Sequence, residues 1–87
     1  MPVYQCPCYT FEFLGKAVQI RYEKDSTITR QLIPFTQMLS VRLDSNTDDK
    51  VHSLTLLLHE SIKYSYAFKN LQEAEKIYDQ FTQALLQ

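Results

Sequence analysis

The chain is poor in the residues that interrupt regular structure, and it has no long apolar run. Its 87 residues include one glycine, three prolines, two cysteines and no tryptophan. A helix that crosses a bilayer needs about 20 consecutive apolar residues. No stretch of the sequence approaches this length, so no membrane-spanning helix is expected. The N-terminus has no basic stretch followed by an apolar one, so no signal peptide is expected either. A cytoplasmic location with free thiols is the resulting expectation.

An excess of charge of one sign is also missing. Nine Lys and Arg stand against ten Asp and Glu, which gives a formal net charge of −1. Proteins that bind nucleic acid usually carry a clear basic excess, because phosphate contacts supply much of their affinity. Apolar residues at 45% and charged residues at 22% are ordinary for a globular domain. The length predicts a single domain with one modest core.

Alternating apolar residues flank the only glycine. Phe11 and Phe13 alternate with polar residues before Gly15, and Val18 and Ile20 do so after it. Period two on both sides of a glycine predicts a β-hairpin. Further strands are predicted over residues 28–33, 38–43, 53–58 and 62–69, with Pro34 at an edge, bulge or corner and a polar loop over 44–50. In the strand over 38–43, the alternation places Leu39, Val41 and Leu43 on one face.

The period changes after residue 69. Asn70 followed by Glu73 is a capping-box arrangement, in which the Asn side chain accepts a first-turn amide proton. Apolar residues then recur at helical spacing: Leu71, Ala74, Ile77 or Tyr78, Phe81 and Leu85. A C-terminal helix with one apolar stripe is expected to cover the apolar face of the sheet.

The predicted fold class is α+β, mostly β. About six antiparallel strands form a curled sheet or barrel that one C-terminal helix closes. The domain comprises an N-terminal segment (1–9), the sheet (10–69) and the helix (70–87).

Two stretches carry a resemblance to a known superfold. They are Ile33-Pro34-Phe35 followed by residues 38–41, and residues 64–68 running into a helix with Ala74, Ile77 and Tyr78. With the order of strands and closing helix, they resemble the pleckstrin-homology-like superfold, in particular its small bacterial members. The resemblance implies seven strands, of which this short chain would lack or merge one. It also implies a helix tryptophan, whose volume Phe81 would fill. Domains of this superfold bind lipids, peptides or proteins, or only scaffold.

The sequence contains no recognisable catalytic or metal-binding motif. Cys6, Cys8, His52 and His59 supply two thiols and two imidazoles, but their spacing does not fit a zinc finger. No nucleophile elbow or glycine-rich turn is present. We therefore expect no metal, no cofactor, no small-molecule substrate and no catalytic activity.

A basic group lies near the first hairpins: Lys16, Arg21, Lys24 and Arg30. The resemblance makes this region a candidate for lipid head groups at a membrane surface. Interleaved acidic residues, Glu12 and Glu23 among them, would cancel most of the field.

The eleven Phe and Tyr residues allow a second alternative, a nucleic-acid-binding face on which bases stack. The predicted core accounts for most of these rings but not for Tyr4 and Tyr9.

Protein–protein interaction or self-association, through an edge strand, is the main functional hypothesis. Val3, Tyr4 and Tyr9 in the apolar stretch 2–9 are the candidate contact residues.

Overall fold

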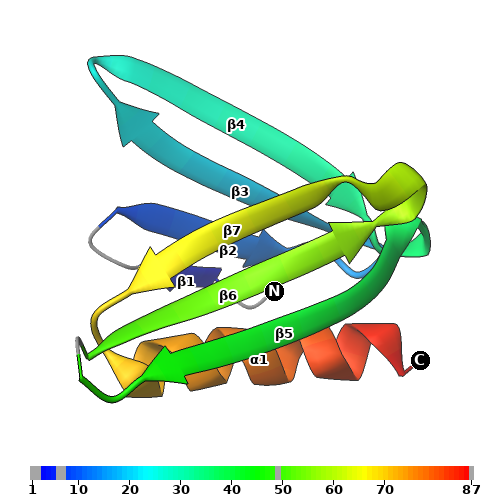
Figure 1. Cartoon of the computed structure of the whole chain (residues 1–87). Helices are drawn as coiled ribbons and strands as arrows, with labels where there is room; N and C mark the ends of the chain where they lie inside the picture. The colour runs from blue at the N-terminus through cyan, green and yellow to red at the C-terminus, as the bar shows by residue number, and fades with distance from the viewer. Residues whose placement is uncertain (1–2, 6–7, 49, 87) are drawn as a thin grey trace. The chain divides into compact units, whose positions relative to one another are not determined.

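A computed structural model describes residues 3–5, 8–48 and 50–86. Seven strands are followed by one helix, as Figure 1 shows. The chain divides into two compact units, Met1–Thr36 and Gln37–Gln87, and each contains one antiparallel sheet.

The first unit is a four-stranded meander. Its strands are β1 (Val3–Gln5), β2 (Tyr9–Phe13), β3 (Ala17–Lys24) and β4 (Thr27–Pro34), and they lie in the order β1-β2-β3-β4. Every neighbouring pair is antiparallel. Strands β1 and β4 are therefore the two edges of this sheet.

The hairpin predicted at Gly15 is confirmed. Phe11 pairs with Ile20 and Phe13 with Val18 across β2 and β3. Gly15 has a φ of 90°, in the left-handed region that residues with a Cβ rarely adopt. These four side chains point to one face of the sheet and are buried, as is Ile33 of β4, which pairs with Val18.

A second, tighter turn joins β3 to β4. Only Asp25 and Ser26 lie between the paired residues Lys24 and Thr27, and their φ values are 52° and 65°. Two consecutive left-handed residues form a type I′ turn, whose twist matches that of the flanking strands. This turn sets the register of the whole β3–β4 hairpin.

The second unit is a three-stranded sheet with a helix. Strands β5 (Met38–Asn46), β6 (Val51–Leu58) and β7 (Lys63–Phe68) lie in the order β5-β6-β7. The 3₁₀ turns η1 (Phe35–Gln37) and η2 (His59–Ser61) precede β5 and β7. Helix α1 (Leu71–Leu85) packs chiefly along β5 and also contacts β6 and β7.

The apolar face of this second sheet departs from the predicted alternation at Leu39. Met38 pairs with Leu58 and Ser40 with Leu57, so Leu39 is the extra residue of a β-bulge. The bulge turns Met38 into the core and leaves Leu39 55% exposed. The prediction that Leu39 shares a face with Val41 and Leu43 is wrong, because one inserted residue reverses the alternation on that side.

The C-terminal helix agrees with its predicted cap and stripe. The Asn70 side-chain oxygen accepts the Glu73 backbone N–H at 3.2 Å. Ala74, Ile77 and Phe81 are fully buried, whereas Leu71 at the first turn is exposed.

The α+β, mostly β class with a closing helix is confirmed, and two details are corrected. The strands number seven rather than six, and the described strands form two sheets rather than a closed barrel. The additional strand β1 is only three residues long, too short to produce a recognisable alternation. Within the described ranges, no helix is long and apolar enough to cross a bilayer.

The bulge yields a first prediction. Met38→Ala should lower the free energy of unfolding by about 2 kcal/mol or more, because a buried side chain is removed. Leu39→Ala should cost less than about 0.5 kcal/mol, because this side chain is exposed. Urea unfolding of the two variants measures both values. A larger cost for Leu39→Ala than for Met38→Ala would contradict the bulge.

A second prediction concerns the helix cap. Asn70→Ala should lower stability by about 1 kcal/mol, because the Glu73 N–H loses its acceptor. Asn70→Ser keeps an acceptor and is the matched control. Thermal unfolding of the two variants at one pH measures the difference, and equal losses would argue against the cap.

Candidate functional site

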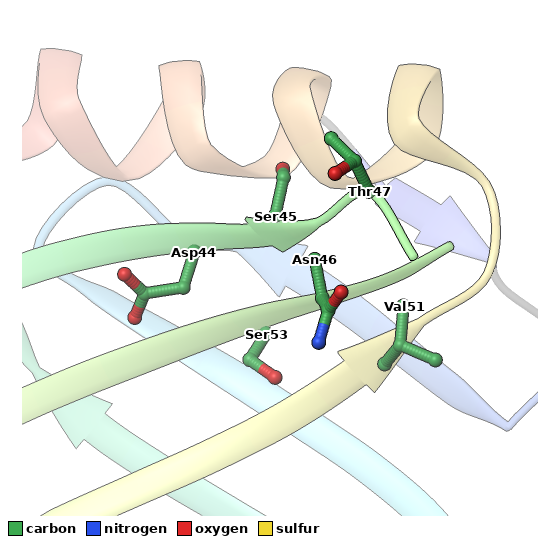
Figure 2. Close-up of a pocket in the computed structure, with 6 residues that line it drawn as sticks. All are labelled: Asp44, Ser45, Asn46, Thr47, Val51 and Ser53. Carbon is green, nitrogen blue, oxygen red and sulfur yellow. The ribbon is translucent and has the colours of Figure 1, made fainter. Parts of the chain in front are cut away.

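A shallow pocket lies at the turn end of the β5–β6 hairpin. It has a volume of about 540 Å³ and is lined by Asp44, Ser45, Asn46, Thr47, Val51 and Ser53 (Figure 2). Ser45 and Thr47 point toward the helix, whereas Asp44 and Ser53 lie on the other side of the sheet.

Three polar side chains of this pocket, Asp44, Ser45 and Asn46, form hydrogen bonds with nearby residues. The Asp44 carboxylate accepts a hydrogen bond from Arg42 Nε at 2.8 Å. The Asn46 side-chain oxygen accepts the Asp48 N–H at 2.9 Å, which stabilises the turn. Ser45 of the lining lies against His52, whereas Asp44, the single carboxylate of the lining, is on the opposite face of the sheet.

The cysteines and histidines lie apart. His52 is in β6, where its Nδ1 is 2.9 Å from Ser45 Oγ, and His59 begins the turn after the same strand. Seven residues of extended chain separate the two imidazoles by roughly 20 Å. Cys8 is exposed, and Cys6 lies outside the described residues. In the described ranges, no three His, Cys, Asp or Glu side chains are placed to hold a metal ion.

Only two of the four basic candidates come together. Lys16 precedes β3 and Lys24 ends it, so the length of the strand separates them. Lys24 also lies on the opposite face of the sheet from Arg21. Arg21 and Arg30 are direct cross-strand partners, and both are exposed.

The three candidate contact residues near the N-terminus occupy two faces. Tyr4 packs edge-on against Phe13 with ring centroids 5.9 Å apart, and Tyr9 lies 6.1 Å from both Phe11 and Tyr22. Both tyrosines thus belong to the aromatic face of the first sheet. Val3 alternates with Tyr4, lies on the other face and is 49% exposed.

Of the eleven aromatic side chains, six are partly exposed and five are buried. The buried rings are those of Phe11, Phe13, Tyr66, Phe68 and Phe81. A buried ring cannot stack on a nucleotide without unfolding its surroundings.

The most distinctive surface is the free edge of β4. Strand β4 pairs with β3 on one side, and no other described strand pairs with it. The Phe35 N–H donates to the Lys16 carbonyl at 2.9 Å, so Lys16 and Phe35 form a hydrogen-bonded pair at the end of the β3–β4 ladder. Hydrogen-bonded and non-hydrogen-bonded pairs alternate along an antiparallel ladder. Counting along the ladder from that pair, the β4 residues in non-hydrogen-bonded pairs include Ile28, Arg30 and Leu32. Their N–H and C=O groups point away from β3. We call these three residues the β4 edge.

Exposed apolar side chains accompany these backbone groups. Ile28 is 50% exposed and Leu32 is 61% exposed, and Arg30 lies between them on the same face. The interpretation of the sequence did not identify this site. The only indication in the sequence was that apolar and polar residues do not alternate regularly over residues 28–33, because apolar side chains occupy the solvent face.

No protein-family model, curated protein or solved structure matches the chain. The β4 edge and its chemistry are therefore the basis for proposing a function.

A third prediction follows from the β4 ladder. The amide protons of Ile28, Arg30 and Leu32 should exchange with solvent much faster than those of Thr29, Gln31 and Ile33, which face β3. Residue-resolved hydrogen exchange by NMR measures this alternation. Uniform protection along β4 would mean that its outer side is already paired in solution.

Proposed function

We propose that this chain is a non-catalytic interaction module that binds an extended segment of a protein partner along the β4 edge. The observation that carries the proposal is an eight-residue edge strand with outward backbone groups and exposed Ile28 and Leu32. Such an edge is a template for strand addition, in which main-chain hydrogen bonds provide affinity and alternate side chains provide specificity.

The other sheet edges suit this role less well. Strand β1 has only three residues, and β5 packs against helix α1. Strand β7 begins with Lys63, and the other two residues on its solvent face, Ser65 and Ala67, are small. A charged side chain, lysine in particular, is common on edges that do not bind other strands. Strand β4 combines length, a free side and exposed apolar side chains.

The pleckstrin-homology-like resemblance fits this proposal. Seven strands followed by one closing helix are what the resemblance implies. We propose this architecture as the framework, with the interaction assigned to the β4 edge and not to a lipid site. The four basic residues do not converge into one pocket, and the buried rings lend no support to a nucleic-acid face.

The fourth prediction tests strand addition itself. Extended peptides selected from a random displayed library on the wild-type protein should shift the amide resonances of Ile28, Arg30 and Leu32. Leu32→Pro should weaken their binding by about tenfold or more, because proline removes an outward N–H without breaking the β3–β4 ladder. Fluorescence anisotropy of the labelled peptides measures the affinities.

The matched control is Ala67→Pro on strand β7. Leu58 donates to the Ile62 carbonyl, so by alternation Ala67 also directs its N–H away from the neighbouring strand. Ile28→Pro provides a second test if Leu32→Pro unfolds the protein. Failure to select any peptide, or equal losses for Leu32→Pro and Ala67→Pro, would contradict binding at β4.

A further inference from the structure

The β4 edge carries one of two arginines that lie side by side on the same face of the sheet. Arg21 on β3 and Arg30 on β4 are directly opposite each other and form a non-hydrogen-bonded pair. In such pairs the two Cα atoms are about 4.5 Å apart, which is closer than in the hydrogen-bonded pairs. Like charges at this position repel and destabilise the sheet.

Two acidic residues share this face: Glu12 is diagonal to Arg21, and Glu23 is diagonal to Arg30. Glu23 is on the same face as Arg21, but its cross-strand partner is Ile28. Among the described residues, neither arginine forms an ion pair or a side-chain hydrogen bond. If another strand paired with the outer side of β4, one of its side chains would lie directly opposite Arg30 on this face.

We propose that the segment bound at the β4 edge belongs to another protein and carries an aspartate or glutamate opposite Arg30. Side chains two residues before and after it, which face Ile28 and Leu32, are apolar. The partner motif is thus apolar, any residue, acidic, any residue, apolar, in extended conformation. The carboxylate neutralises the Arg21–Arg30 pair, and the flanking side chains cover the two exposed apolar residues. This inference rests on the proposed function.

A second copy of the chain fits this edge less well. In a two-fold antiparallel pairing that places Ile28 opposite Leu32 of the other copy, Arg30 faces Arg30 of that copy. The register that matches the apolar side chains therefore adds a second like-charge contact. Charge complementarity selects an acidic partner segment instead.

The fifth prediction uses two defined probes, acetyl-Thr-Val-Thr-Glu-Thr-Val-Thr-amide and the same peptide with lysine in place of glutamate. The wild-type protein should bind the glutamate peptide about tenfold more tightly. Arg30→Glu should reverse the preference, because repulsion replaces attraction at the central position. Lys63→Glu makes the same charge change on edge strand β7 and should leave the preference unchanged. Anisotropy of the labelled peptides measures the affinity of each of the two peptides for the wild-type protein and for each of the two variants.

The outcomes separate this inference from the proposed function. Equal affinity for both peptides, with amide shifts at Ile28, Arg30 and Leu32, would overturn the acidic motif but leave strand addition standing. Binding of neither peptide would overturn the motif as well, and absence of any selected peptide would overturn both proposals. Sedimentation with phosphatidylserine vesicles that depends on Arg30, without a peptide preference, would assign the arginines to a lipid surface. A dimer that Leu32→Pro dissociates would make a second copy the occupant.

Discussion

The two-residue turn at Asp25 and Ser26 is the constraint on which the chemistry of β4 depends. It pairs Lys24 with Thr27, and the period of two then assigns every later residue of β4 to one face and one hydrogen-bonding direction. A shift of one residue would turn the outward groups of Ile28, Arg30 and Leu32 toward β3. Neither turn residue is glycine, although both have positive φ. Asp tolerates this region better than most residues, and the eight-pair ladder behind the turn maintains it.

Features that depend on local signals were predictable from the sequence. The hairpin at Gly15 and the helix after Asn70 are each specified by a period and a terminating residue within a few positions. Features that depend on pairing between distant residues were not. The separation into two sheets and the bulge at Leu39 arise from how strands align, which alternation alone does not encode. The short strand β1 exists because Tyr4 pairs with Phe11, a contact without a local signature.

The candidate site could be only partly predicted from the sequence, because it too depends on pairing between distant residues. Arg21 and Arg30 stood out as basic residues, but their opposition requires the register that the turn sets. The strand that contains Arg30 gave an unclear pattern, because Ile28 and Leu32 occupy its exposed face while Gln31 lies on the face of buried Ile33. Natural sequences break the pattern of polar outside and apolar inside mainly where function requires it. Once the register was known, the irregular pattern over residues 28–33 therefore pointed to the candidate site.

The proposed binding at β4 requires that the edge accept one partner while avoiding others, and the magnitudes indicate how it would do so. A segment that pairs with Ile28, Arg30 and Leu32 forms about six backbone hydrogen bonds, each worth about 1 kcal/mol net, whatever its sequence. Those bonds cannot discriminate between an acidic partner and a second copy. The side chain opposite Arg30 can, since attraction in one case and repulsion in the other differ by about 1–2 kcal/mol in total. Pro34 limits the strand at its C-terminal end, because it has no N–H to offer a longer ladder. In the proposed complex the backbone of β4 thus supplies the affinity, and the arginine pair supplies the choice among strands that would otherwise bind equally.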